Sequence, residues 1–257
     1  KISDQPMIYP MQQLMDYDFL MKHFYNVHTS TTADRELMNA KNLLSKDLTL
    51  EKEDAPQILI YHTHSQESYK NSKKDENVVA VGQKLTDLLT EKGWNVYHDT
   101  TVYDLAVGKL DRSRAYTYAL EGINEILARY PSIQVVLDIH RDGVGEDVYL
   151  KTEIGGQPSA RIMFFNGLSR TKKNGPIDYL YNPYIEDNLA LTLQLKLLCD
   201  QYYPGLSRNI YLKSLRYNLH LSDKALLIEV GAQTNTLQEI LNTMEPLSAL
   251  LAKVFGV

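Results

Sequence analysis

The stretch IQVVLDIHRDG, residues 133–143, decides the fold because it joins a short apolar run to a charged end. It is rich in β-branched residues and is interrupted only by Gln134 and Asp138 before it reaches His140. A run of this length and composition is typical of a buried strand rather than of a helix. A helical pattern precedes it at residues 112–130, so the stretch predicts a strand that follows a helix in an α/β protein.

The same alternation of strand and helix continues on both sides of this stretch. We expect further strands at residues 57–62, 94–99, 161–166 and 225–231, and helices at residues 78–92, 112–130, 185–203 and 236–254. Such an alternation predicts a mostly parallel or mixed central sheet with helices on both faces. Between Gly143 and Gly175 the content of Gly, Lys and Asn rises, which predicts loops or an antiparallel excursion.

The 257 residues suffice for one sizeable α/β domain, which we place at residues 55–257. Residues 1–54 are expected to form an N-terminal arm that packs on this domain through short helices at residues 16–25 and 32–46. A Thr/Asp capping signal opens the second of these helices. The chain begins at Lys1 without a methionine, so we expect a longer protein with a targeting or anchoring segment upstream.

Composition argues against several classes of function. A net charge of −5 and a pI near 5.8 offer no large basic face, so we expect neither nucleic acid nor a membrane surface as a partner. Cys199 is the one cysteine, which excludes an intrachain disulfide and a thiolate metal cluster and favours plain core packing. No run reaches the roughly eighteen consecutive apolar residues of a membrane helix.

Ionisable residues follow the ends of several predicted strands, where open α/β sheets build their sites. The stretch ILIYHTHSQESY, residues 58–69, places His64 and Glu67 in an H-x-x-E spacing, and His140 ends the central strand. Two imidazoles and one carboxylate are the protein ligands of many hydrolytic zinc sites. We therefore expect these three residues to hold Zn²⁺. The alternative is that the histidines are structural and that Glu67 is a solvated loop residue.

The stretch ALLIEVG, residues 225–231, places Glu229 at the end of an apolar strand. Burial raises the pKa of an unpaired carboxylate, and such a glutamate beside activated water is suited to act as a general base. The alternative is an ion pair with Arg141 or a helix cap. Arg141 itself is expected to hold a substrate carboxylate in a bidentate contact, unless it pairs with Asp142.

Two more residues are expected to support the predicted ligands. Asp138 lies two residues before His140 on the same strand face, where it can accept a hydrogen bond from the imidazole N–H. It could instead end the apolar run or pair with Arg141. In an extended segment His62 points to the same side as His64, so we expect it to contact a ligand from outside or to be a ligand itself.

The stretches ILIYHTHSQESY, VVLDIHRDG and ALLIEVGAQTNTLQEI together resemble the stage II sporulation protein P family. That family is similar to the zinc-dependent N-acetylmuramoyl-L-alanine amidases of the cell wall, and the resemblance covers about residues 43–255. It implies an amidase or zinc-carboxypeptidase-like fold and a hydrolase that cuts the amide between muramic acid and L-alanine, with peptide cross-links as a further target. It also implies an extracytoplasmic enzyme of sporulation engulfment, anchored by an N-terminal membrane helix, with stage II sporulation proteins D and M as partners.

Residue by residue, the resemblance matches His64, His140 and Glu229 to two zinc ligands and the catalytic glutamate of the amidases. The second ligand matches less well, because amidases place a glutamate at the start of the next helix, where this chain has Glu76 slightly out of register. We prefer Glu67, which has the spacing of the zinc carboxypeptidases, and keep Glu76 as its rival. Two other classes remain open: a zinc exopeptidase of similar fold and a non-catalytic scaffold that binds the cell wall.

Overall fold

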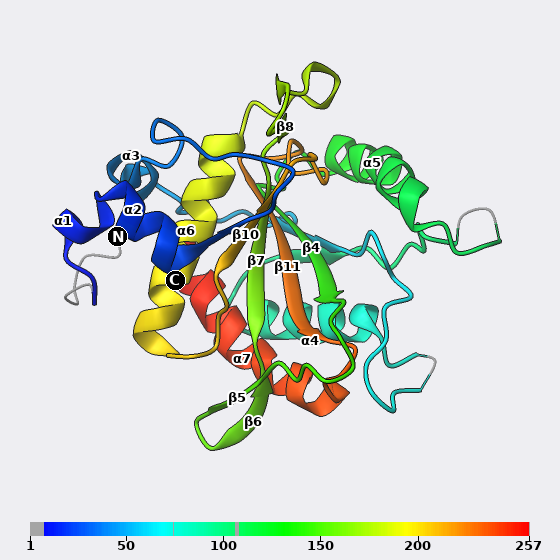
Figure 1. Cartoon of the computed structure of the whole chain (residues 1–257). Coiled ribbons are helices and arrows are strands. Elements are labelled where there is room, and N and C mark those ends of the chain that lie inside the picture. The colour runs from blue at the N-terminus through cyan, green and yellow to red at the C-terminus, as the bar shows by residue number, and fades with distance from the viewer. Residues whose placement is uncertain (1–7, 74, 106–107, 257) are drawn as a thin grey trace.

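A seven-stranded mixed sheet forms the centre of the molecule in a computed structural model that describes residues 8–73, 75–105 and 108–256 (Figure 1). Its neighbouring strands are parallel except for β7 and β11, which are antiparallel. In spatial order the strands are β1 (Tyr25–Val27), β10 (Ile210–Lys213), β7 (Ile162–Gly167), β11 (Lys224–Ala232), β4 (Val135–Asp142), β2 (Ile58–Tyr61) and β3 (Val96–His98). The predicted mostly parallel or mixed α/β sheet is confirmed.

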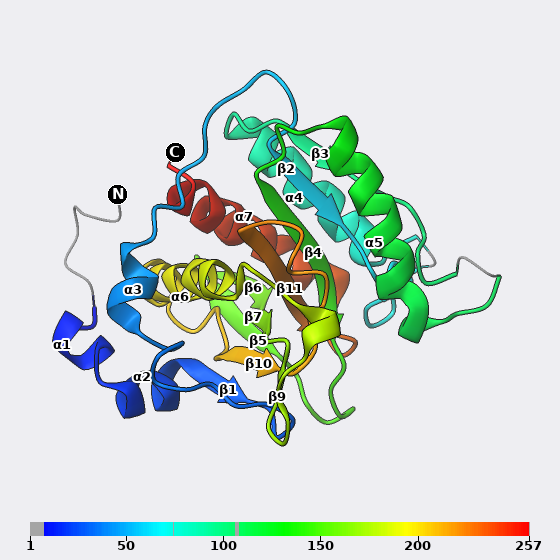
Figure 2. The same ribbon diagram turned by 90° about the horizontal axis from the view of Figure 1, so that it is seen from above.

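Helices cover both faces of this sheet. One face packs against α4 (Val78–Glu91), α6 (Ile185–Tyr202) and α7 (Leu237–Val254), and the other against α5 (Arg112–Arg129). Figure 2 shows α5 across the sheet from α6 and α7. Both α4 and α7 bury one apolar stripe, whereas α6 is buried almost all round because α3 (Ala40–Ser45) covers its outer side. The four long helices lie close to their predicted positions.

The alternation of side chains along β4 separates a fully apolar face from a face that ends in polar residues. Leu137 and Ile139 belong to the core beneath α4, α6 and α7, whereas Val136 belongs to the smaller core under α5. Asp138 and His140 continue the row of Val136, since side chains two residues apart in a strand share a face. The polar side chains at the end of β4 therefore lie on the face of the sheet that α5 covers.

Two small hairpins lie outside the sheet, between β4 and α6. They are β5 (Lys151–Ile154) with β6 (Gln157–Ala160), and β8 (Arg170–Thr171) with β9 (Gly175–Pro176). A single 3-10 turn, η1 (Asp178–Leu180), follows the second hairpin. These hairpins form the antiparallel excursion that the composition of this region predicts.

The N-terminal segment has more regular structure than expected. Its helices are α1 (Met11–Leu14), α2 (Tyr17–Phe24) and α3, and the three residues of β1 pair with β10 at the edge of the sheet. Helix α3 is shorter than the predicted helix at 32–46, because Asn39 caps it and Asp34 instead closes a turn by accepting from Leu37 N. The first seven residues of the predicted arm lie outside the described residues. None of the helices in the described ranges has the length and apolar character that a membrane span requires.

Candidate metal centre and catalytic site

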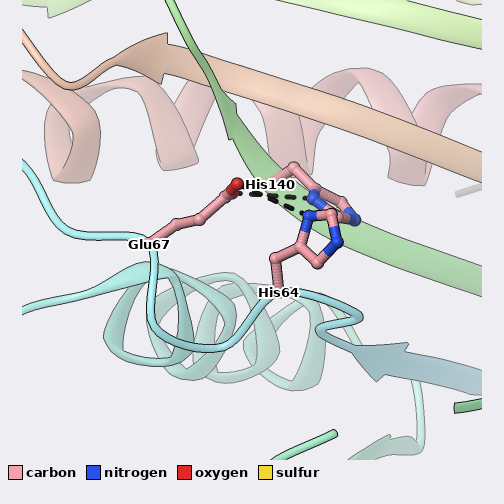
Figure 3. Close-up of side chains that lie close together, drawn as sticks. All are labelled: His64, Glu67 and His140. Atoms are coloured by element: carbon pink, nitrogen blue, oxygen red, sulfur yellow. Dashed lines mark ion pairs between the residues drawn. The ribbon is translucent and has the colours of Figure 1, made fainter. Parts of the chain in front are cut away.

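Three side chains that the sequence singled out converge at the end of the sheet. His64 and Glu67 come from the loop after β2, and His140 comes from β4 (Figure 3). Nδ1 of His64 lies 3.6 Å from Glu67 Oε1, and Nδ1 of His140 lies 3.5 Å from Glu67 Oε2. One donor atom from each of the three residues lies within 4.8 Å of the other two, and Glu67 and His140 are buried.

A tight turn after β2 brings His64 and Glu67 to the same point. The strand ends at Tyr61, and Thr63 then donates from its N–H and its hydroxyl to the two oxygens of Asp138, at 2.9 and 2.6 Å. The backbone N–H of Glu67 donates to His64 O at 3.4 Å, which closes the turn. An H-x-x-E spacing therefore works here because the residues lie on a loop, where three positions span one turn.

The donor set fits a tetrahedral Zn²⁺. Two ligands about 2.1 Å from a tetrahedral ion lie roughly 3.4 Å apart, close to the separations between Glu67 and the two Nδ1 atoms. The other ring nitrogens face oxygens: Nε2 of His64 lies 3.3 Å from Arg112 O, and Nε2 of His140 lies 2.9 Å from Asp138 Oδ1 as a charge contact without hydrogen-bond geometry. Outer acceptors of this kind fix the ring orientation and leave the opposite nitrogen free to bind metal. The residues present thus fit the ion that the resemblance implies.

The electrostatics of the cluster also favour a cation. Burial alone would raise the pKa of Glu67, but the two imidazoles and the Arg141 N–H hold it well below the usual value. Burial disfavours the imidazolium of His140, yet the carboxylates of Asp138 and Glu67 raise the pKa of His140 well above 6.5. Two buried carboxylates therefore surround one imidazole, and a proton or a metal ion can balance their charge.

Glu229 lies beside the cluster on the neighbouring strand. It is the register partner of His140 across the parallel β11 and β4, so both side chains are on the same face. Glu229 Oε2 is buried without a hydrogen-bond partner among the described residues, and burial raises the pKa of this carboxyl to about 8. No ion pair joins Glu229 to Arg141 in the described part of the chain. The predicted ion pair with Arg141 is thus absent among the described residues, and the role of general base stays a prediction.

Arg141 contacts the loop that carries Glu67. Its backbone N–H donates to Glu67 Oε2 at 3.0 Å. In the guanidinium, Nε donates to Ser68 O at 2.7 Å and Nη1 donates to Asp142 O at 3.1 Å. Each two-nitrogen edge of the guanidinium is thus partly used, which leaves no free edge for a bidentate carboxylate. The predicted substrate contact is therefore not what the geometry favours. The carboxylate of Asp142 pairs with Arg208 Nη1 at 2.6 Å instead of with Arg141.

His62 lies apart from the candidate ligands. Its Nδ1 bonds to Ile139 O at 3.0 Å and its Nε2 lies 3.0 Å from His98 Nε2, with the ring packed against Gly82 of α4. Burial lowers the pKa of His62 to about 4, so the ring is neutral at pH 7. The expectation that His62 shares a side with His64 assumed an extended chain through both residues. The strand ends before them, and the turn separates the two rings.

Glu76, the rival ligand, lies outside the cluster. Its Oε2 accepts from Lys73 N at 2.8 Å in the loop that precedes α4. Two neighbours of the cluster were not foreseen from the sequence, namely Arg112, whose Nη1 lies 3.8 Å from Glu67 Oε1, and Tyr116, whose ring is 5.4 Å from that of His64. Both lie in the first turns of α5, and no strand-end pattern marks them.

Comparison with known proteins gives the family of the chain. Residues 18–252 match the family model described as stage II sporulation protein P. The chain belongs to the stage II sporulation protein P family. Stage II sporulation protein P of Bacillus subtilis (strain 168) is 30% identical over 205 residues, which cover 73% of this chain and 48% of the relative. The chain thus spans about half the length of that member of the family.

Several solved structures resemble the fold of this family member at a distance. One is the amidase CwlD of Clostridioides difficile in complex with the lipoprotein GerS, at 18% identity and a TM-score of 0.46, covering 77% of this chain and 99% of the other. Another is the N-acetylmuramyl-L-alanine amidase Ami1 of Mycobacterium smegmatis, at 10% identity and a TM-score of 0.45, covering 80% and 99%. With TM-scores below 0.5, these structures are too distant to indicate function.

Proposed function

We propose that this chain is a zinc-dependent peptidoglycan hydrolase that cleaves the N-acetylmuramoyl-L-alanine amide during engulfment in sporulation. One observation supports the chemistry above all: His64, Glu67 and His140 form a zinc-sized donor set, with Glu229 on the adjacent strand. Membership of the stage II sporulation protein P family supports the process. We assign the chemistry to residues 55–257, with residues 1–54 as a supporting arm.

A zinc ion bound to His64, Glu67 and His140 would supply Lewis-acid activation of water and of the scissile carbonyl. The remaining steps fall to side chains of this chain. Glu229 accepts the proton of the attacking water at its carboxylate and passes it to the amine that leaves with L-alanine. The carboxylate of Asp138 lies 2.9 Å from Nε2 of His140 and stabilises positive charge on that ring, and the backbone N–H of Arg141 fixes one oxygen of Glu67. These contacts keep the donor atoms in place as the charge in the site changes.

The proposal extends to place and partners. The enzyme would act outside the cytoplasm, in the space between the mother-cell and forespore membranes, held there by an N-terminal anchor in the longer protein. Stage II sporulation proteins D and M would be its partners, and peptidoglycan cross-links would be a second target. These elements rest on the family resemblance, and no contact surface for a partner is assigned.

Metal analysis combined with mass spectrometry of digested peptidoglycan tests this function. We expect about one zinc per chain, and digestion products that carry free L-alanine amino termini and intact glycan strands. Activity on soluble peptides but not on purified walls would instead identify a zinc exopeptidase. Wall binding with neither stoichiometric zinc nor cleavage would identify a non-catalytic scaffold.

A further inference from the structure

A pocket of about 420 Å³ opens next to the candidate metal centre. It lies between the first turns of α5 and the loop that follows β10, and η1 closes one side. Tyr116 belongs both to this pocket and to the surroundings of the ligands, since its ring centroid is 5.4 Å from that of His64 and 6.5 Å from that of His140. A molecule that reacts at the metal centre can thus extend into this pocket.

The pocket contains an arginine without a counter-charge. Arg216 has no acidic partner among the described residues, and its Nε is buried without a hydrogen-bond partner there. Its Nη1 donates to the carbonyl of Tyr181 at 3.2 Å. By contrast, Arg170 and Arg208 lie 2.5 and 2.6 Å from carboxylate oxygens. Partial burial also lowers the pKa of Arg216.

The loop that carries Arg216 is held in a strained shape. Tyr217 and Asn218 both adopt left-handed backbone conformations, with φ of 52° and 57°. Asn218 Nδ2 donates to Tyr116 O at 2.8 Å, which ties the loop to α5. Gly167 lets the loop come close, because a Cβ there would lie 2.1 Å from Leu215 O. Strain of this kind persists where the surrounding structure fixes a site geometry.

We propose that Arg216 binds a carboxylate on the peptide side of the substrate, within the pocket beside the metal centre. This inference rests on the proposed function, in which the substrate is a peptide-bearing wall fragment. Stem peptides carry such groups on D-Glu and at their C-terminus, and a guanidinium without an acidic partner binds a carboxylate through charge-assisted hydrogen bonds. Tyr116 and Tyr217 both line this pocket, and their ring centroids lie 5.5 Å apart.

Binding of a released stem peptide tests this assignment without turnover. The probe is L-Ala-γ-D-Glu-L-Lys, measured by calorimetry on the zinc-loaded chain, with the D-Glu α-carboxyl and the C-terminal carboxyl amidated one at a time. We expect amidation of one of the two groups to weaken binding about 10- to 100-fold, the usual value of one charge-assisted contact. The amidated probe that binds more weakly identifies the carboxylate that Arg216 binds.

Variants of two arginines complete the test. Arg216→Gln should bind the probe with the free carboxylate more weakly by the same factor, and should bind the acid and the amide equally well. Arg216→Lys should recover part of the preference for the acid. Arg129→Gln, at the exposed far end of α5, removes an equal charge and should bind like the parent chain. Equal discrimination in the parent chain and in a folded Arg216→Gln variant would overturn the assignment, as would a parent chain indifferent to both amidations. Zinc content and wall cleavage, measured in parallel, report separately on the proposed function.

Discussion

Glu229 and His140 are register partners on two parallel strands, so a carboxyl with a raised pKa lies beside a candidate metal ligand on the same face of the sheet. Regular strand pairing sets this relationship and makes it rigid. A general base must lie within hydrogen-bond reach of the water that it deprotonates. The fold therefore supplies the proximity that the proposed chemistry needs, and each part of the site can be tested on its own.

The two histidines should be essential for the metal. We expect His64→Ala and His140→Ala each to lower zinc affinity by at least about a hundredfold, because each removes one of three protein ligands. Atomic absorption on the dialysed proteins measures this directly. His23→Ala, on an exposed part of α2, is a matched control that should retain full zinc. Full occupancy in either ligand variant would refute the assignment.

The two candidate carboxylates should behave differently. Glu67→Ala should lose zinc, since Glu67 lies between the two imidazoles, whereas Glu76→Ala should keep both zinc and activity. Zinc content and wall digestion on both variants decide between them. Loss of zinc from Glu76→Ala alone would transfer the ligand role to the helix-start glutamate and would require the loop before α4 to rearrange.

Glu229→Gln should separate binding from chemistry. The substitution keeps the shape and one oxygen but cannot accept a proton, so zinc should stay bound while turnover falls by a factor on the order of 10² to 10⁴. Cleavage of a muramyl amide and zinc content are the two measurements. A stable, zinc-loaded variant with activity near that of the parent would exclude the base role.

The same substitution should change how stability depends on pH in the metal-free chain. Burial holds the pKa of Glu229 at about 8 in the folded state, whereas an unfolded glutamate titrates near about 4.3. Between these values the folded chain binds one more proton than the unfolded chain, so stability falls as pH rises. With chelator present, the melting temperature of Glu229→Gln minus that of the parent should therefore increase as the pH is raised from about 5 to about 8. A constant difference across this range would show that the carboxyl is already ionised.

Gly82 offers a test of the position of His62. Alanine normally stabilises a helix relative to glycine by up to about 1 kcal/mol, yet a Cβ at Gly82 would lie 2.5 Å from His62 Nε2 and 2.8 Å from His98 Nε2. We expect Gly82→Ala to destabilise the chain by about 1–3 kcal/mol in urea unfolding. Adding His62→Ala should recover part of that loss. If the changes in the free energy of unfolding of the two single variants simply add in the double variant, the two residues do not touch.

The sequence predicted those parts of the site that local patterns mark. Apolar runs with a charged end located β4 and β11, and with them His140 and Glu229, because strand ends at one edge of a parallel sheet must meet. Arg112 and Arg216 escaped notice, since a helix start and a loop enter the site only through tertiary packing. The expected position of His62 was wrong because strand alternation was extended past the residue where the strand ends.

The fold shows the same division. Helices α4, α5 and α7 were predictable from apolar periodicity, α6 from its long run of apolar and helix-favouring residues, and the five predicted strands from their composition. Strands β1 and β10 were missed, although β3 and β2 are equally short and were predicted. Their existence depends on pairing between segments almost two hundred positions apart in the chain.

The pairing of β1 with β10 also bears on how the protein resists self-association. Tyr25–Val27 covers the outer side of β10, and without it the backbone amides and carbonyls of Ile210–Lys213 would face solvent. An uncovered strand of this kind is a template for pairing with other chains. A protein shortened to begin at residue 55 would keep every candidate ligand and still risk aggregation through this bare edge.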